Sequence, residues 1–319
     1  MKPDILYMGR YPEALERKLL EEFNAHPLWS ESGALAELTP AMIEATVATG
    51  MNPAPFTGAL MARLPKLKAI CRLGVGYETI DVAAARERGI TVTNTPDCTS
   101  DAVADMAMGL LLAVVRHIAR GDRFIREGRW TSPQAYPMVE GLGGKRLGIF
   151  GLGNIGREIA RRAAAFKLDI AYVSRTRRDV PYAYYSDLAI MAAAIDYLVI
   201  AAPLTPATRH IVDARVLEAL GPKGVLVNIA RGSLVDEAVL IAALRDGVIA
   251  GAGLDVFEHE PSVPPALLAL DNVVLTPHRG GADWQTWWRC FDLACANVRA
   301  VLAGKPALTP VPETPLRSP

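Results

Sequence analysis

The chain has 319 residues, 51% of them hydrophobic, and its 34 Lys and Arg residues balance 34 Asp and Glu residues. This length suits about two domains with cores of their own, and the composition excludes a disordered chain. A formal net charge of zero excludes a global electrostatic attraction for nucleic acid or an anionic membrane. We therefore expect no nucleic-acid partner and no membrane partner.

Targeting signals and metal-binding patterns are missing from the sequence. The N-terminus has no secretory hydrophobic region, and the longest apolar run, Met106–Val115, is too short to span a bilayer. Cys71, Cys98, Cys290 and Cys295 lack the spacing of a zinc site, and four thiols in a chain of this length suit a reducing compartment. We expect a cytoplasmic protein without a metal.

Short apolar segments rich in β-branched residues alternate with longer amphipathic segments. The expected strands are Asp4–Gly9, Ala45–Gly50, Lys68–Leu73, Ile90–Thr93, Arg146–Phe150, Asp169–Ser174, Tyr197–Ala202, Val225–Ile229, Gly251–Val256 and Asn272–Thr276. The expected helices are Pro12–Asn24, Asp81–Arg88, Asp101–Ala119, Ile155–Lys167, Asp213–Ala219, Asp236–Arg245 and Trp284–Leu302. This alternation predicts an α/β fold of βαβ units, with parallel sheets covered on both faces. The proline-rich tail from Lys305 is expected to be a surface strap or a frayed end.

A glycine-rich motif lies between the strand Arg146–Phe150 and the helix Ile155–Lys167. It reads Gly151-Leu152-Gly153-Asn154-Ile155-Gly156. Such a motif alone is common in turns, but between a strand and a helix it is typical of dinucleotide binding. The first glycine permits the tight turn, the second lets the backbone approach the pyrophosphate, and the third lets helix and strand pack closely. The helix N-terminus offers free N–H groups to the phosphates.

The next strand indicates which dinucleotide is bound. NAD-specific sites place an acidic residue about 20 residues beyond the glycines, where it binds the ribose 2′-hydroxyl. This chain has Ser174, Arg175 and Thr176 there and no acid. Arg175 can form a forked pair with a 2′-phosphate, and the two hydroxyls can donate hydrogen bonds. A solvated basic loop is the alternative, but it leaves the missing acid unexplained. We predict that NADP(H) is preferred over NAD(H).

Three polar residues, Arg231, Glu260 and His278, each follow a different predicted strand. Taken singly they are a surface arginine, a solvated glutamate and a histidine closing a loop. In a parallel sheet, however, the carboxyl ends of all strands lie at one edge, which is also where a dinucleotide binds. We therefore expect the three to meet in one crevice and to be catalytic.

At these residues the chain resembles the D-isomer-specific 2-hydroxyacid dehydrogenase family. The matching segments are Leu73–Tyr77, Asn94–Pro96, Gly151–Gly156, Pro203–Thr205, Asn228–Gly232, Asp255–Pro261 and Thr276–Gly281. The resemblance implies two doubly wound parallel-sheet domains. A Rossmann NAD(P)-binding domain, residues 99–286, would be inserted into a flavodoxin-like substrate domain, residues 1–98 and 287–319.

The resemblance also agrees with the roles that the chemistry of these residues suggests. Arg231 is expected to hold a substrate carboxylate and polarise the keto oxygen, together with the backbone N–H groups of Val75 and Gly76. His278 is expected to donate a proton while Glu260 orients the imidazole and favours its protonated form. Besides the glycine-rich motif and Ser174–Thr176, the expected cofactor contacts are Pro203, Thr208, Ile229, Ala230, Arg231, Asp255, His278 and Gly280.

By resemblance the protein is a homodimer, with the stretch Gly121–Gly144 at the subunit contact.

Two departures from the family pattern lie near where substrate preference is set. Arg279 follows the catalytic histidine where an apolar residue is frequent, and Asp105-Met106 stand where many members have Glu-His.

The expected substrate is a small 2-keto acid, glyoxylate or hydroxypyruvate, reduced to the D-2-hydroxy acid. One of Trp284, Trp287 and Trp288 would cap the site and exclude aryl side chains, although packing within the helix interface is the commoner fate of such residues. The alternative is an arylpyruvate, namely hydroxyphenylpyruvate.

Other functions fit the sequence less well. Formate and phosphite dehydrogenases usually favour NAD, and a phosphoglycerate dehydrogenase with a regulatory domain needs a longer chain. The alternative function from another class is that of a dinucleotide-sensing corepressor. The sequence does not favour it, because it shows no long disordered tail and no basic face.

Overall fold

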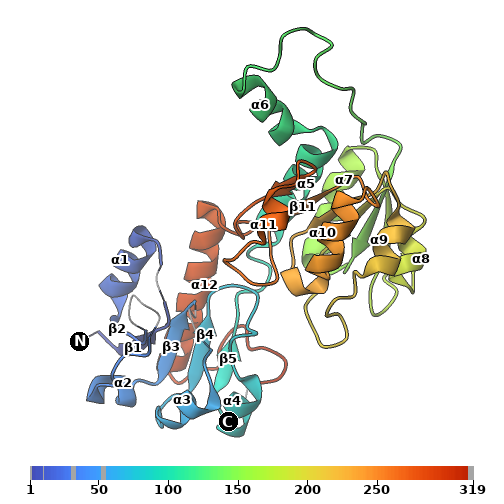
Figure 1. Ribbon diagram of the computed structural model, residues 1–319. Helices are drawn as coiled ribbons and strands as arrows, with labels where there is room; N and C mark the ends of the chain where they lie inside the picture. The colour runs from blue at the N-terminus through green and yellow to red at the C-terminus, as the bar shows by residue number, and fades with distance from the viewer. Residues whose placement is uncertain (1, 10, 30–33, 52–54, 315–319) are drawn as a thin grey trace. The chain divides into compact units, whose positions relative to one another are not determined.

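The computed structural model describes residues 2–9, 11–29, 34–51 and 55–314. The chain divides into two compact units, both of which appear in Figure 1. Unit 1 comprises Met1–Thr99 and Asp283–Pro319, and unit 2 comprises Ser100–Ala282. The chain therefore leaves unit 1, completes unit 2 and returns through one helix, α12 (Trp284–Leu302). The predicted boundaries at 98 and 286 lie within a few residues of these divisions.

Unit 1 contains a five-stranded parallel sheet with the strand order β2-β1-β3-β4-β5. Its strands are β1 (Asp4–Tyr7), β2 (Asn24–Pro27), β3 (Val47–Gly50), β4 (Ala69–Arg72) and β5 (Thr91–Thr93). Its helices before α12 are α1 (Glu13–Glu22), α2 (Pro40–Glu44), α3 (Gly58–Ala62) and α4 (Val82–Glu87). The order 2-1-3-4-5 is that of the flavodoxin-like fold, so the predicted architecture is confirmed for this unit.

Both faces of this sheet are buried, because successive strand residues point to opposite sides. Leu6 and Ile70 pack in a cluster with residues of α2, α3 and α4, whereas their neighbours Ile5 and Ala69 pack with α1 and α12. The described part of the tail adds to the edge strand β5. Val311 N donates to Val92 O at 2.9 Å, and the tail is therefore a strap up to residue 314. Residues 315–319 lie outside the described part of the chain.

Unit 2 contains a seven-stranded parallel sheet with the order β12-β11-β10-β9-β6-β7-β8. Its strands are β6 (Arg146–Phe150), β7 (Asp169–Val173), β8 (Ala183–Tyr185), β9 (Tyr197–Ile200), β10 (Val225–Asn228), β11 (Gly251–Leu254) and β12 (Val273–Leu275). Its helices are α5 (Ser100–Val115), α6 (Ile118–Arg126), α7 (Asn154–Ala165), α8 (Leu188–Ala192), α9 (Ala214–Leu220), α10 (Glu237–Arg245) and α11 (Pro265–Leu268). Counted from β6, this is the doubly wound order 3-2-1-4-5-6 with one further strand, so the predicted Rossmann architecture is confirmed.

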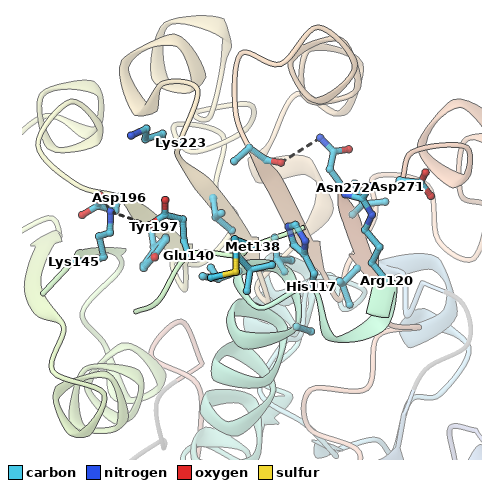
Figure 2. Close-up of a pocket in the computed structure, with 18 residues that line it drawn as sticks. His117, Arg120, Met138, Glu140, Lys145, Asp196, Tyr197, Lys223, Asp271 and Asn272 are labelled. Atoms are coloured by element: carbon cyan, nitrogen blue, oxygen red, sulfur yellow. Dashed lines mark hydrogen bonds and ion pairs between the residues drawn. The ribbon is translucent and has the colours of Figure 1, made fainter. Parts of the chain in front are cut away.

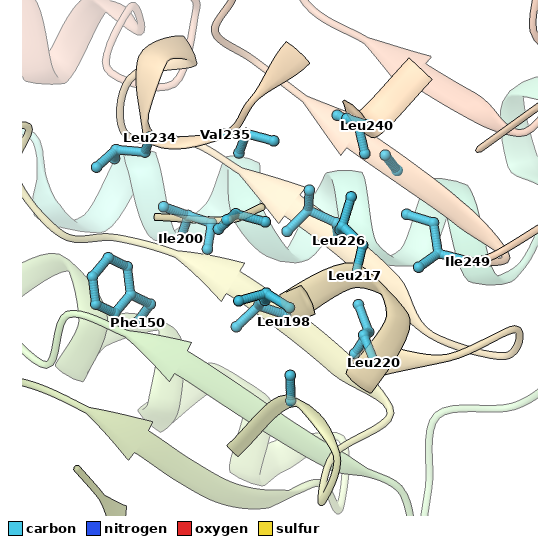
Figure 3. Close-up of a cluster of buried hydrophobic side chains, with 14 of the residues drawn as sticks. Phe150, Leu198, Ile200, Leu217, Leu220, Leu226, Leu234, Val235, Leu240 and Ile249 are labelled. Atoms are coloured by element: carbon cyan, nitrogen blue, oxygen red, sulfur yellow. The ribbon is translucent and has the colours of Figure 1, made fainter. Parts of the chain in front are cut away.

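The core of unit 2 lies on both sides of this sheet. Figure 3 shows one side, where Leu198 of β9 and Leu226 of β10 pack beside Leu217 and Leu220 of α9. On the other side Val199 of β9 packs in a cluster with α5 and α7. These strands therefore read as continuous apolar runs, as expected of a parallel sheet covered by helices.

The helix predicted over Asp101–Ala119 is two helices. α5 ends at Val115, His117 adopts a left-handed conformation with φ of 52°, and α6 then begins at Ile118. In the described chain no single helix is long and apolar enough to cross a membrane, and α5 and α6 reach that length only as a pair bent by 57°. α6 and the loop after it extend away from the rest of unit 2 (Figure 1).

Two edge strands, β2 and β8, were not predicted. β2 begins at Asn24, which the pattern assigns to the preceding helix, and its four residues are all partly or fully exposed. β8 has only three residues, none of them fully buried. Edge strands with so little buried surface lack the apolar signature that sequence patterns detect.

Candidate active site

The carboxyl-terminal edge of the seven-stranded sheet carries almost all the predicted site residues of unit 2. His278 follows β12, Glu260 follows β11 and Arg231 follows β10, and these three strands are neighbours. Next along the edge come the loop after β9, the glycine-rich motif after β6, and Ser174–Thr176 after β7. The strand order thus places the three polar residues at one end of the edge and the basic loop at the other, with the glycine-rich turn between them.

The glycine-rich turn has the shape that a dinucleotide phosphate requires. Gly151 has φ of 102°, and a Cβ there would lie 2.6 Å from Ala202 N. A Cβ on Gly156 would lie 2.1 Å from Gly151 O, so helix and turn pack with no room for a side chain. Around Gly153 nothing lies within 4 Å of the position of a Cβ. The turn is therefore closed toward the protein and open at Gly153, the N-cap of α7, where a phosphate could reach backbone N–H groups.

The basic loop begins beside this turn, because Gly151 N donates to Val173 O at 2.9 Å. The side chains of Arg175, Arg177 and Arg178 have no hydrogen-bond or ion-pair partner in the described part of the chain. Ser174 Oγ donates to Thr176 O at 2.6 Å, so its one hydroxyl hydrogen closes the loop internally. The guanidinium groups rather than the Ser174 hydroxyl are thus the donors that this loop offers to an anion.

The loop after β9 contains Pro203 and Thr208, two predicted cofactor contacts. The Thr208 hydroxyl accepts a hydrogen bond from Thr205 N at 2.8 Å and lies 3.0 Å from Pro203 O. These bonds fold the loop back on itself at the edge, between the glycine-rich turn and the loop that carries Arg231.

The loop that carries Arg231 is held by a residue that sequence reasoning did not single out. Asn228 is buried at the end of β10, accepts from Ala230 N at 3.1 Å and donates to Arg231 O at 2.9 Å. The peptides at Ile229 and Ala230 are thereby fixed at the edge. A polar residue ending an otherwise apolar strand was the available signal.

Glu260 and His278 form a direct pair, with Glu260 Oε2 2.7 Å from His278 Nδ1. Glu260 Oε1 accepts from Phe257 N at 3.0 Å, which fixes the carboxylate. Burial raises the pKa of Glu260, but the hydrogen bonds from His278 and Phe257 and the charges of His278 and Arg231 outweigh it, so its pKa is lowered. The carboxylate therefore stays ionised, and the pairing of Nδ1 leaves Nε2 of the exposed imidazole for a substrate.

The histidine itself sits in a left-handed conformation, with φ of 52°. Asp255, which is buried, holds its loop in place. One carboxylate oxygen of Asp255 accepts from Thr276 Oγ1 at 2.5 Å and from Arg279 N at 2.8 Å, and the other accepts from Gly280 N at 2.7 Å. Asp255 therefore receives hydrogen bonds from residues on both sides of His278 and holds its strained backbone in place.

Glu258, which sequence reasoning also missed, ties the Glu260 loop to the loop after β9. Its Oε1 lies 2.7 Å from Arg209 Nη2 and 2.8 Å from His210 Nε2, and the Glu258 side chain is largely buried. A Cβ on Gly232 would lie 1.9 Å from the carbonyl carbon of Phe257, so the loop with Arg231 also packs against this segment. Three loops of the edge are therefore mutually fixed.

Val75 and Gly76, the other predicted substrate contacts, belong to unit 1. They follow β4, and their carbonyl groups accept from Asn94 Nδ2 at 2.8 Å and Arg72 Nε at 3.2 Å. In the described chain their two N–H groups have no acceptor. Consecutive free N–H groups form a concavity suited to a carboxylate.

The tryptophans of α12 differ in surroundings. Trp287 and Trp288 pack against the core of unit 1, and Trp288 also lies edge-on to Phe291. Only Trp284 is largely exposed.

The two departures from the family pattern lie in different surroundings. Arg279 is exposed, whereas Asp105 Oδ1 pairs with Arg162 at 2.6 Å between α5 and α7.

A cavity of about 230 Å³ lies away from this edge (Figure 2). It is lined by Tyr197, Val225 and Val273, the first residues of β9, β10 and β12, and therefore sits at the amino-terminal edge of the sheet. Met138 and Glu140 of the loop after α6 form part of its wall. The cavity is thus separate from the predicted site.

In the described chain, no cluster of three or more His, Cys, Asp or Glu side chains could hold a metal ion.

Comparisons with known proteins agree with this arrangement. The family model described as D-isomer specific 2-hydroxyacid dehydrogenase, NAD binding domain, matches residues 108–280. Hydroxyphenylpyruvate reductase from Plectranthus scutellarioides is 42% identical over 308 residues, which is 96% of this chain and 98% of that protein. Glyoxylate/hydroxypyruvate reductase A from Arabidopsis thaliana is 44% identical over 310 residues, again 96% and 98%.

A solved structure is similar over the whole chain. It is the NADPH-dependent glyoxylate/hydroxypyruvate reductase from Sinorhizobium meliloti in complex with NADP and malonate. It has a TM-score of 0.91 and 43% identity, and the match covers 100% of this chain and 99% of that one.

The glycine-rich turn gives a paired prediction. Gly153→Ala meets no protein atom, so the variant should keep its thermal stability but bind a nicotinamide dinucleotide at least tenfold more weakly, because the methyl group occupies the space of a phosphate. Gly156→Ala clashes with backbone and should lose both stability and binding. Melting curves and fluorescence titration with NADPH test the pair. Normal binding by Gly153→Ala would contradict this reading of the turn.

Proposed function

Because the chain belongs to the D-isomer specific 2-hydroxyacid dehydrogenase family, we propose that it is an NADPH-dependent reductase of small 2-keto acids. The observation that carries the proposal is the Glu260–His278 pair, 2.7 Å apart, at the sheet edge where the dinucleotide motif also lies. Glyoxylate and hydroxypyruvate are the proposed substrates, and D-2-hydroxy acids are the products. A cytoplasmic location stays a prediction from cysteine usage.

The bound nicotinamide supplies the hydride in this reaction. The part of this chain is to orient the keto acid and to move one proton. Arg231 holds the carboxylate and polarises the keto oxygen with a planar guanidinium, which suits both contacts. The free N–H groups of Val75 and Gly76 are offered to a carboxylate from unit 1. His278 Nε2 gives its proton to the keto oxygen, while Glu260 keeps the ring in orientation and stabilises its charged form.

Two observations support NADPH over NADH. No acidic side chain lies within Ser174–Arg178, directly after β7, and this segment carries three unpaired arginines. A 2′-phosphate would therefore find cations there, whereas a 2′-hydroxyl would find no carboxylate. The similar structure from Sinorhizobium meliloti is described as NADPH-dependent.

Hydroxyphenylpyruvate is the second candidate substrate, because the Plectranthus scutellarioides reductase is nearly as similar as the Arabidopsis thaliana one. With Trp287 and Trp288 packed on their own unit, Trp284 is the tryptophan left to restrict the substrate side chain. Removing it in a Trp284→Ala variant distinguishes the two candidates.

The first test is a panel of keto acids with NADPH and NADH in parallel. We expect kcat/KM for glyoxylate or hydroxypyruvate to exceed that for hydroxyphenylpyruvate and phenylpyruvate. NADPH should be preferred at least tenfold, equivalent to about 1.4 kcal/mol. Trp284→Ala should raise the activity with aryl substrates. A higher kcat/KM for an arylpyruvate than for both small acids contradicts the substrate assignment, and equal use of NADPH and NADH contradicts the cofactor assignment.

The proton-transfer roles have their own test. His278→Ala should lower kcat roughly a hundredfold or more, the usual scale of general acid catalysis, while NADPH still binds. Glu260→Gln removes a negative charge beside the imidazole, and this disfavours the protonated form that donates the proton. The basic limb of the pH–rate profile should therefore move to lower pH. If His278→Ala turns over near the normal rate, another group donates the proton.

We also propose that the protein is a homodimer through α6 and the loop after it, a segment that contains the predicted stretch Gly121–Gly144 and begins three residues before it. This segment exposes large apolar side chains, with Trp130 60% exposed and Met138 98% exposed. Ile118 and Ile125 of α6 are more than half exposed as well. Such a concentration of exposed apolar surface marks an interaction site.

Light scattering should show a dimer, and deletion of Trp130–Val139 should convert it to a monomer. Leu268→Ser, which alters an equally exposed apolar residue on α11, is the control and should remain dimeric. A monomeric and active parent protein would rule out this segment as an obligatory contact.

A further inference from the structure

Tyr172 is a fully buried tyrosine in β7, two residues before the basic loop. Its ring belongs to the core between the sheet and α5 and α7, and it also contacts Tyr184 of the neighbouring strand β8 at 5.4 Å between ring centroids. A buried hydroxyl needs hydrogen-bond partners, since leaving it unpaired is costly. The partners of this hydroxyl are not in the core.

The Tyr172 hydroxyl binds both backbone groups of one loop residue. It accepts a hydrogen bond from Arg178 N at 2.7 Å and donates one to Arg178 O at 3.2 Å. The loop is anchored at its other end where Val173 O accepts from Gly151 N at 2.9 Å. Residues 174–177 therefore form a loop, exposed from Arg175 to Arg177, with both ends hydrogen-bonded to the body of unit 2.

This arrangement matters for an anion because of conformational entropy. Ordering each backbone residue on binding costs conformational entropy, so a loop that is already closed binds its ligand more tightly than a free one. Inside the loop, Ser174 Oγ donates to Thr176 O, which shapes it further. The side chain of Arg175 is exposed and unpaired at the centre of this closed segment.

We propose that Tyr172 is a specificity-determining residue, which holds the Ser174–Arg178 segment in the shape that binds the 2′-phosphate of NADP(H) without touching the cofactor. The inference rests on the proposed preference for NADPH. It concerns a positioning role, and it predicts that the hydroxyl of Tyr172 affects the 2′-phosphate selectively. A purely structural hydroxyl would affect NADPH and NADH alike.

The test compares Tyr172→Phe with the parent protein and with Tyr197→Phe. Tyr197 is the first residue of β9, at the amino-terminal edge of the same sheet, and donates one hydrogen bond to Gly141 O at 3.3 Å. Loss of this hydroxyl is therefore a matched control. The ratio of kcat/KM for NADPH to that for NADH should fall about fivefold in Tyr172→Phe. That ratio should stay within about twofold in Tyr197→Phe. Proportional weakening of both cofactors, or no change, overturns the inference.

A double-mutant cycle tests whether Tyr172 acts through the arginine. Arg175→Ala should itself lower the NADPH to NADH ratio. In that background, Tyr172→Phe should change the ratio less than about twofold, because the group that it positions has gone. An undiminished fivefold effect would contradict action through Arg175.

A measurement on the cofactor-free protein separates this inference from the proposed function. Trypsin cuts after arginine, and cleavage within Arg175–Arg178 should be several-fold faster in Tyr172→Phe than in the parent or in Tyr197→Phe. Unchanged cleavage shows that the hydroxyl does not hold the loop. If cleavage accelerates but the parent protein uses NADH equally well, the tether exists and the assignment of the 2′-phosphate falls.

Discussion

The parallel direction of the seven strands in unit 2 is the constraint on which its chemistry depends. Because every strand runs the same way, every loop that follows a strand leaves at one edge, whatever its distance along the chain. The strand order then decides which loops are neighbours. It places Arg231, Glu260 and His278 on adjacent strands, and separates them from the basic loop by the turn at Gly151. An elongated ligand with phosphates in its middle and different groups at its ends matches that sequence of loops.

Two carboxylates make this edge precise enough for chemistry, and they do so in different ways. Asp255 is buried and receives three hydrogen bonds, so its burial is offset and the strained loop of His278 is held. Glu260 is partly exposed and pairs with the imidazole of His278, and its lowered pKa keeps a negative charge beside that ring. Glu258 pairs with Arg209 and so joins the loop that carries Glu260 to the loop after β9.

The sequence predicted the strands that are buried on both sides and the position, at one edge of the sheet, of the polar residues that follow them. Buried apolar strands such as β6 and β9 carry a strong signal, and the strand order places the residues at their ends. The edge strands β2 and β8 bury too little to be recognised, and the break at His117 depends on a backbone conformation that no apolar pattern encodes. Supporting residues were missed for a related reason. The sequence shows Tyr172 as an ordinary core tyrosine, and only the fold shows that its hydroxyl binds Arg178, six residues later.

We propose that this edge holds the nicotinamide and the keto acid so that a hydride passes to the keto carbon while His278 protonates the oxygen. The most direct test uses NADPH deuterated at the transferable C4 position, with hydroxypyruvate as substrate, followed by mass spectrometry and chiral chromatography of the product. We expect a D-2-hydroxy acid that carries one deuterium at C2. An unlabelled product, or the L enantiomer, would contradict it.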